Sequence, residues 1–234
     1  MKTVLALLLA CCLCQPAGAG IKEGIAAYNT GRFDVALDEF LAAADQGSAE
    51  AQVSLGVMYE NGQGVLRDYE KTLGWYRKAA DQGHFGAQNN LGLMYAAGRG
   101  VAKNAGQAQE WYAKAAEQGF APAQNNLAQL YASGALGKKD YAKALEWDRK
   151  AANQGFAIAH GDLGSMYENG LGVPKNLVVA YTYYTIAVGG GYEPATAQRN
   201  AVAKQLSSDQ RDKALWAAQT WRPGDGLPSM PAAQ

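Results

Sequence analysis

The stretch Ala87–Gly119 reads AQNNLGLMYAAGRGVAKNAGQAQEWYAKAAEQG, and its pattern indicates how most of the chain is built. Apolar and small residues recur every three or four positions on both sides of Gly98 and Gly100. This spacing places them on one face of an α-helix, and glycine adopts the left-handed conformation that ends many helices. The stretch therefore predicts two amphipathic helices joined by a glycine-rich turn.

This helical pair is one copy of a repeat of 36 residues. Four blocks align without a gap, at 48–83, 84–119, 120–155 and 156–191. Six block positions are identical in all four copies: alanine at 4 and 32, leucine at 8, tyrosine at 12, and glycine at 15 and 36. One helical pair cannot bury both of its faces, so stacked pairs have to supply the core. The 28 glycines of the 234 residues are then turns and close contacts, not low-complexity sequence.

Each block predicts a first helix over positions 3–14 and a second over about positions 21–34. Position 21 holds Asp or Asn, which are favoured at helix N-caps. Aromatic residues at position 28 are predicted to lie on the buried face of the second helix, namely Trp75, Trp111, Trp147 and Tyr183. Small residues at position 9 are predicted to let helices approach closely, namely Gly56, Gly92, Ala128 and Gly164.

The N-terminus is predicted to be a targeting segment, with a cleaved signal peptide over residues 1–19. Lys2 precedes an apolar run over residues 4–13, and Ala17–Ala19 is a small-residue cleavage signal. The apolar run is too short to span a bilayer, so no membrane span is expected. All three cysteines lie in this segment, which leaves the mature chain without a disulfide or a cysteine-based site. These features predict a periplasmic or secreted protein, typical of bacteria; a lipoprotein signal lipidated at Cys11 is the alternative.

Helices are also predicted on both sides of the four blocks. Residues 20–47 follow tetratricopeptide spacing and predict an N-terminal helical pair. Residues 192–222 predict C-terminal capping helices, one over 193–206 and a second that starts at a capping box formed by Ser207 and Gln210. Residues 223–234 are rich in proline and glycine and predict a disordered tail.

Blocks such as Ala87–Gly119 resemble the Sel-one-like repeats, which are relatives of the tetratricopeptide repeats. The resemblance covers the four blocks and implies an all-α fold: a right-handed α/α superhelix of about four helix-turn-helix repeats with capping helices at both ends. It also implies that the first helix of each pair lines the concave side. The third block departs from the pattern at its turn, Gly134–Gly137, where the others read Gly-x-Gly. A different loop shape is expected there.

Little in the sequence points to catalysis. With 21 basic and 21 acidic residues, the chain is formally neutral, which argues against a nucleic-acid partner. His84 and His160 are two blocks apart, lack the spacing of a zinc site and are read as structural or solvated, and no Gly-x-Ser-x-Gly elbow is present. The Gly-x-Gly turns lack the Gly-Lys-Ser/Thr of a phosphate loop. No cofactor, metal or catalytic residue is predicted, although a Ser–His–Asp site assembled across repeats stays open.

Residues that bind a partner should vary between blocks, because adjacent repeats meet different parts of a ligand. The variable positions 3, 6, 10 and 13 form one stripe on the first helix. The predicted partner-binding groove comprises Val53, Val57, Glu60, Asn89, Leu93, Asn125, Gln129, Ser165 and Glu168. Asn89 and Asn125 could pair with a peptide backbone, so replacing both with alanine is expected to weaken partner capture with little change in melting temperature. A merely solvated face is the alternative.

The sequence therefore predicts a non-enzymatic scaffold or adaptor in the cell envelope that holds a protein or peptide in its groove. A second hypothesis follows from the resemblance: cysteine-rich exported members of the family bind or hydrolyse β-lactams. The absence of cysteine from the predicted mature chain disfavours it. A third hypothesis is a structural regulator tethered to the membrane through Cys11.

Overall fold

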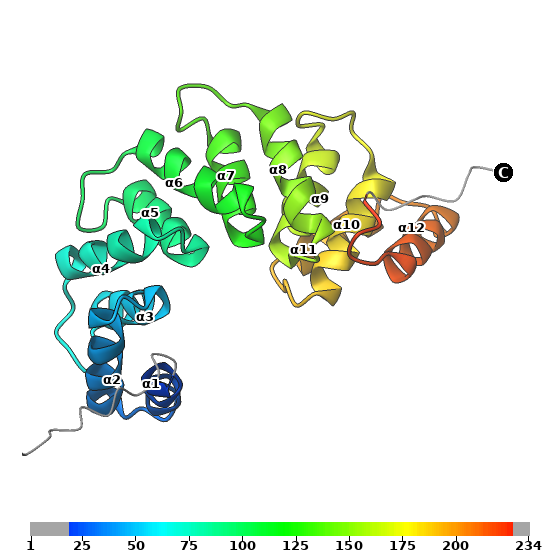
Figure 1. Ribbon diagram of the computed structural model, residues 1–234. Helices are drawn as coiled ribbons and strands as arrows, with labels where there is room; N and C mark the ends of the chain where they lie inside the picture. Colours follow the sequence, from blue (N-terminus) through cyan, green and yellow to red (C-terminus); the bar gives the residue numbers. More distant parts are fainter. Residues whose placement is uncertain (1–18, 227–234) are drawn as a thin grey trace, which may run out of the picture. The chain divides into compact units, whose positions relative to one another are not determined.

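The structure is a computed structural model, and it describes residues 19–226 (Figure 1). These residues form twelve α-helices and no strand, which confirms the predicted all-α class. The described part divides into two compact units, with the boundary between Ala79 and Ala80. Of the signal peptide predicted over residues 1–19, only Ala19 lies within the described residues.

The first unit contains three helices and most of a fourth. They are α1 (Ala19–Asn29), α2 (Phe33–Asp45), α3 (Ala49–Asn61) and α4 (Tyr69–Asp81), which crosses the unit boundary. Phe40, Leu55 and Met58 are fully buried in its core. The helices α1 and α2 pack against each other, and α2 packs on α3.

The second unit contains the remaining helices in chain order. They are α5 (Phe85–Ala97), α6 (Ala105–Glu117), α7 (Ala121–Ser133), α8 (Tyr141–Asn153), α9 (Ala157–Asn169), α10 (Leu177–Gly189), α11 (Ala195–Ala203) and α12 (Ser208–Thr220). From α5 to α11 each helix packs on the next, and α12 also packs on α10. None of the helices in the described part of the chain combines the length and apolarity that crossing a membrane would require.

Helix boundaries follow the predicted signals closely. The side chain at position 21 caps the second helix; in α6, for example, the backbone N–H of Gln107 donates to Asn104 at 3.0 Å. Glycine at position 15 ends the first helix in the left-handed conformation, with φ of 73° at Gly98. The capping box of Ser207 and Gln210 forms at the start of α12. In the third block, a hydrogen bond between Gly137 and Gly134 gives the turn the different shape that was expected.

A ladder of buried amides joins successive helix pairs in the second unit. Gln88 donates from Nε2 to the Ala80 carbonyl at 3.3 Å, and Gln124 donates likewise to Ala116 at 3.1 Å. Each also accepts a hydrogen bond at its Oε1, from Gln118 at 2.7 Å and from Gln154 at 2.8 Å. These bonds satisfy the buried amides, so position 5 is structural. His160 occupies the same position in the fourth block.

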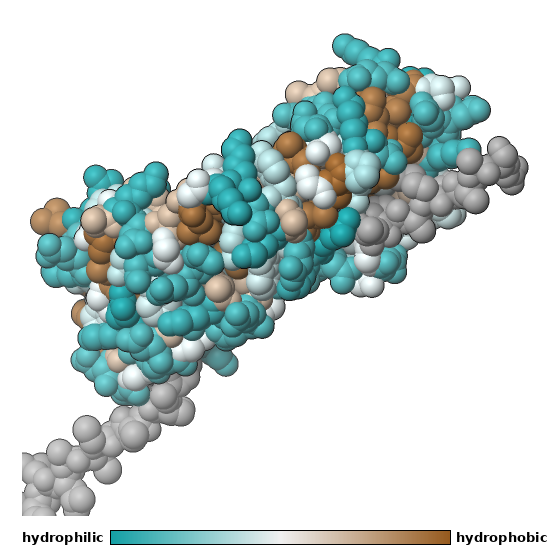
Figure 2. Space-filling model, turned by 90° about the horizontal axis from the view of Figure 1, so that it is seen from above, coloured by the Kyte–Doolittle hydropathy of each residue, from teal (hydrophilic) through white to brown (hydrophobic). Residues whose placement is uncertain are grey.

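The aromatic residues at position 28 are not all buried as predicted. Trp111 and Tyr183 are buried, but Trp75 and Trp147 are only half-buried. A lysine three residues later covers each tryptophan, with Lys150 Nζ 3.9 Å from the Trp147 ring centroid. This cation–π contact shields the exposed ring face. On the side shown in Figure 2, hydrophobic residues lie in separate patches on a mainly hydrophilic surface.

The chain end is held against α8 and α9. The Trp221 ring meets the His160 ring edge-on, with centroids 4.6 Å apart. Beyond it, Gly224 N–H donates to the Asn153 carbonyl at 2.9 Å and Gly226 N–H donates to Asn153 Oδ1 at 2.8 Å. The segment predicted to be disordered therefore begins with hydrogen-bonded residues. Residues 227–234 lie outside the described part.

Candidate functional site

Three residues of the predicted groove lie in the first unit. Val53 and Val57 are half-buried and line an apolar cavity of about 120 Å³ with Phe40 and Tyr28. Glu60 accepts a hydrogen bond from the Tyr76 hydroxyl at 2.8 Å. The two valines therefore share one small apolar depression, and the Glu60 carboxylate is tied to α4.

In the second unit, Asn89 and Asn125 are buried, whereas residues that contact a ligand were expected to be exposed. Asn89 is 7% exposed and Asn125 is 3% exposed. Asn126 donates from Nδ2 to Asn89 Oδ1 at 2.8 Å, which links the second repeat to the third. Since both amides serve the packing of repeats, alanine at these positions should lower the melting temperature, contrary to the expectation from sequence. Leu93 stays exposed, at 42%.

Asn125 bridges two carboxylates. Its Nδ2 donates to Asp148 Oδ1 at 2.8 Å and to Asp162 Oδ2 at 2.7 Å. Gln129 donates from Nε2 to Asn125 Oδ1 at 3.3 Å and to Asp162 Oδ2 at 3.1 Å. The bonds join the third repeat to the fourth and bring the predicted residues Asn125 and Gln129 together at Asp162, which was not predicted.

Asp148 stands where the other blocks have a tyrosine. That tyrosine packs on the small residue at position 9: a Cβ added to Gly92 would lie 2.4 Å from the Tyr112 ring. The third block has Ala128 there, and the shorter Asp148 leaves room for its methyl group. Asp148 is 3% exposed. Burial, and next the Asp162 charge, raise the pKa of Asp148 well above its usual value, while the Asn125 hydrogen bond opposes the shift.

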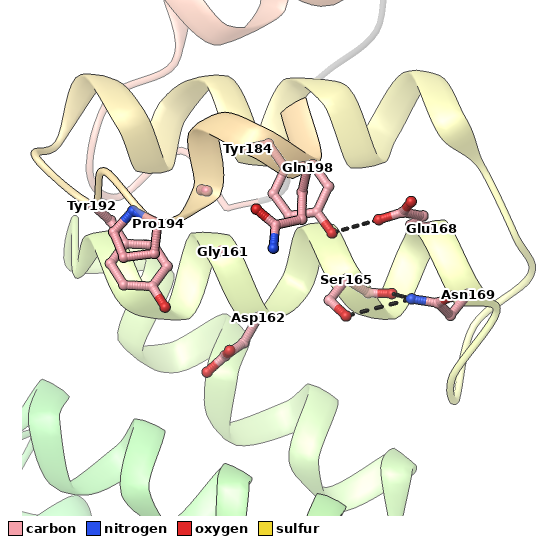
Figure 3. A pocket seen from close by; sticks show the side chains of 10 residues that line it. Gly161, Asp162, Ser165, Glu168, Asn169, Tyr184, Tyr192, Pro194 and Gln198 are labelled. Atoms are coloured by element: carbon pink, nitrogen blue, oxygen red, sulfur yellow. Dashed lines mark hydrogen bonds between the residues drawn. The ribbon is translucent and has the colours of Figure 1, made fainter. Parts of the chain in front are cut away.

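An open pocket of about 340 Å³ lies between α9, α10 and α11 (Figure 3). Its floor is one stripe of α9, formed by Gly161, Asp162, Ser165, Glu168 and Asn169. Its walls are Tyr184 of α10, then Tyr192, Pro194, Ala195 and Gln198 from the segment that begins the C-terminal cap. We call these ten residues the α9 pocket. Ser165 and Glu168 of the predicted groove line it, whereas the other seven predicted residues do not.

Tight packing of aromatic rings on glycine shapes this pocket. A Cβ added to Gly161 would lie 2.7 Å from the Tyr192 ring, and one added to Gly164 would lie 2.6 Å from the Tyr184 ring. The Tyr184 hydroxyl donates to Glu168 Oε2 at 2.7 Å. Burial and this carboxylate raise the pKa of Tyr184, so the phenol stays protonated and keeps donating. The ring and the carboxylate therefore hold fixed positions on the wall and the floor.

The electrostatics of the α9 pocket are one-sided. Asp162 and Glu168 line it, and no Lys or Arg is among its lining residues. Between residues 19 and 226, no Lys, Arg or His forms an ion pair with either of them or with Asp148. No group of three or more metal-ligating side chains occurs in that part of the chain. The pocket therefore presents uncompensated negative charge beside aromatic rings.

Neither histidine forms part of a Ser–His–Asp arrangement in the described residues. His84 Nδ1 accepts from the Ala87 N–H at 3.2 Å and so caps α5. His160 is 1% exposed, and its ring contacts those of Tyr183 and Trp221. Neither His160 ring nitrogen has a hydrogen-bond partner among residues 19–226. Burial lowers the pKa of His160 to about 4, and the nearby Ala152 carbonyl opposes this shift only in part.

Sequence reasoning missed most residues of this region, among them Asp148, Asp162, Tyr184, Tyr192 and Gln198. Two of them carried a signal, because position 29 changes from tyrosine to Asp148 and position 7 changes from asparagine to Asp162 between neighbouring blocks. Tyr192 and Gln198 follow the last block, where no repeat comparison reaches. Departures from the repeat were thus the better guide than a fixed set of variable positions.

Comparison with known proteins identifies the family. The Sel1 repeat family model matches four segments, residues 49–84, 86–120, 121–156 and 157–192. The chain belongs to the Sel1 repeat proteins. A Sel1 repeat protein from Oxalobacter formigenes has a crystal structure with a TM-score of 0.70 and 34% identity, covering 84% of this chain and 82% of its own. The helix-turn-helix repeats predicted from the sequence are therefore confirmed.

Two further solved structures are similar. The protective antigen c5321 of uropathogenic Escherichia coli is 31% identical with a TM-score of 0.52, over 86% of this Sel1 repeat protein and 52% of the antigen. The immunity protein Pa5087 from Pseudomonas aeruginosa is 26% identical with a TM-score of 0.55, over 88% of this chain and 82% of its own. No curated protein matches the chain. Sel1 repeats are typical of scaffolds for protein–protein interaction, and that general role applies here.

Proposed function

We propose that this Sel1 repeat protein is a non-enzymatic scaffold of the bacterial cell envelope that binds a protein or peptide partner through the exposed stripe of its first helices. The observation that supports it most directly is the α9 pocket. There, Asp162, Ser165 and residues that follow the last block line an open depression and do not fill the core. Repeat proteins use such non-repeating positions on a regular frame to bind extended partners.

Site-specific photocrosslinking tests this proposal in living cells. The full chain would carry a photoreactive phenylalanine analogue at Ser165, within the pocket, or at Ala142, which is exposed on α8. A partner held on the stripe should give an adduct of discrete mass from position 165 and none from position 142. Equal adducts from both positions, or none from 165 in cells grown in several conditions, would contradict the scaffold role.

The envelope location rests on the predicted signal peptide and needs its own measurement. Mass spectrometry of the mature protein should show Gly20 as the first residue after cleavage at Ala19. A lipidated Cys11 would replace that cleavage site with the tethered form. An intact Met1 on protein recovered from the cytoplasm would overturn the location.

The enzyme alternative is tested separately. Covalent labelling of the purified protein by a fluorescent penicillin would favour β-lactam chemistry, and no labelling is expected. A second candidate within the scaffold class is neutralisation of a toxic protein, favoured by the 26% identity to the immunity protein Pa5087. Protection of cells against a protein encoded by a neighbouring gene would support it, and loss of that protection in a variant of Ser165 would place the contact.

A further inference from the structure

We propose that the α9 pocket binds the guanidinium group of an arginine side chain on the protein partner, an inference that rests on the proposed scaffold function. The proposal starts from the cavity itself, whose floor and walls come from three helices and the segment between two of them. Figure 3 shows the side chains of Tyr192, Gln198 and Glu168 arranged around the space, with Ser165 on the floor. A ligand here would meet carboxylates, phenol rings and amide groups together.

Charge favours a cation over any other ligand. Asp162 and Glu168 line the pocket without a basic residue beside them. An anion would be repelled, and a purely apolar side chain would desolvate the carboxylates without compensation. A guanidinium can instead form charge-assisted hydrogen bonds with a carboxylate.

The Asp162 carboxylate lies at the edge of the pocket, where its side chain points from α9 toward the third repeat (Figure 3). Both of its hydrogen bonds, from Asn125 and Gln129, end on Oδ2. No donor among the described residues bonds to its Oδ1. Asn125 is itself fixed by Asp148 at 2.8 Å, so the orientation of Asp162 is set by the junction of the third and fourth repeats. The residues Asn125, Gln129 and Asp148 act as positioning residues, since none of them lines the pocket.

The shape of the pocket favours arginine over lysine. Asp162 and Glu168 are six residues apart on α9, which places them about 9 Å apart along the helix axis. The Tyr184 ring lies beside Glu168, and the Tyr192 ring lies against Gly161 (Figure 3). The planar guanidinium stacks on aromatic faces and binds carboxylates in a two-pronged geometry, whereas the ammonium of lysine does neither as well. Ser165 and Gln198 could hydrogen-bond the peptide backbone on either side of the side chain.

A short peptide probe tests the proposal on the full mature chain. N-acetyl-Gly-Arg-Gly-amide would be titrated into isotope-labelled protein and followed by the backbone amide signals of Ser165, Tyr192 and Gln198. The matched peptide replaces arginine with citrulline, which keeps the size and planarity and removes the charge. We expect saturable shifts with arginine, at least 10-fold weaker binding with citrulline, and weaker binding of the arginine peptide as salt is raised.

Variants make the assignment specific. D162N/E168Q removes both charges while the glutamine still accepts from the Tyr184 hydroxyl, and it should weaken arginine-peptide binding at least 10-fold. The matched control E117Q/D212N removes two exposed acids outside the pocket and should leave binding unchanged. An unchanged melting curve would show that D162N/E168Q is folded. Equal binding of citrulline, full binding by folded D162N/E168Q, or shifts confined to other residues would overturn the proposal.

The same variants separate this proposal from the scaffold function. Photocrosslinking from Ser165 would be repeated in D162N/E168Q. If the partner still crosslinks in D162N/E168Q and the arginine peptide does not bind the wild-type protein, the scaffold function stands and the arginine site is wrong. If the peptide binds as expected but no partner crosslinks from Ser165 in wild type, the pocket chemistry stands and the scaffold function fails.

Discussion

In the second repeat the buried side chain at block position 5 is Gln88, whereas in the fourth it is His160. Gln88 donates to one helix pair through Nε2 and accepts from Gln118 through Oε1, so the amide ladder continues. At His160 the ladder stops: Gly190 stands where Gln118 would be, and the Trp221 ring packs on the imidazole at 4.6 Å. A glutamine at this position therefore hydrogen-bonds to the neighbouring helices and links successive repeats. The histidine instead packs on Trp221 from the C-terminal cap, and the series of hydrogen bonds ends there.

The largest expected effect is a pH dependence of the free energy of unfolding that comes from His160 and that a glutamine at this position would not produce. His160 is buried and its pKa is lowered to about 4, against 6.5 in the unfolded chain. The stability that neutral His160 contributes is therefore present above pH 6.5 and is lost as the pH falls toward 4, because the unfolded state binds the proton first. The loss should approach about 3 kcal/mol. Urea unfolding at pH 7, 6, 5 and 4.5 measures it.

His160→Gln is the matched variant, because glutamine is the residue of the other three blocks. It should remove most of the pH dependence in this range and could donate to the Ala152 carbonyl as Gln124 does to Ala116. Equal slopes of stability against pH in wild type and His160→Gln would show that another group controls the acid response.

A second comparison sets the second repeat against the third. A Cβ on Gly92 would lie 2.4 Å from the Tyr112 ring, whereas the third repeat pairs Ala128 with the smaller Asp148. We expect Gly92→Ala to destabilise the chain by about 2 kcal/mol through overpacking. Adding Tyr112→Leu should recover part of that loss, since the shorter side chain makes room for the methyl group. Thermal unfolding of both variants measures this, and a neutral Gly92→Ala would refute the packing argument.

The two asparagines of the groove stripe differ in what they bond. Asn125 donates to two carboxylates, and Asn89 accepts from one amide. We expect Asn125→Ala to cost about 1.5 kcal/mol, because Asp148 is left buried without its donor, and Asn89→Ala to cost less. Chemical unfolding at pH 7 distinguishes them. A larger loss for Asn89→Ala would show that the charge-assisted bonds do not dominate the junction.

Regular features were predictable from sequence, and the site was predictable only in part. Block periodicity located helix starts such as that capped by Asn104, because capping and burial depend on nearby residues. Ser165 and Glu168 were found because they vary on an exposed helical stripe. The burial of Asn89 and Asn125 was not predictable, because it depends on how far the first helix of the next repeat overlaps their own helix. That next helix is α7 for Asn89 and α9 for Asn125. Tyr192 and Gln198 complete the pocket only because the C-terminal cap folds back onto α10, a tertiary contact without a local signal.

The smallest expected effect on stability comes from Asp148 in the third repeat, and its pH dependence is opposite to that of His160. Burial and the Asp162 charge raise the pKa of Asp148, so the folded state disfavours its ionised form. Stability is therefore lost as the pH rises from the unfolded value of 3.8 through the raised pKa, the reverse of the His160 response. Asp148→Asn keeps an oxygen to accept from Asn125 and removes the charge. At pH 7 it should stabilise the chain by about 1 kcal/mol, or roughly 2–4 °C in melting temperature.

This difference should shrink as the pH falls through the raised pKa of Asp148, because the wild-type carboxyl group then also becomes neutral. The comparison is cleanest between His160→Gln and His160→Gln/Asp148→Asn, because the opposing histidine response is then absent from both. A destabilising Asp148→Asn at pH 7 would mean that the ionised carboxylate is the form this junction is built to hold. An ionised Asp148 would also strengthen the negative field at the neighbouring α9 pocket.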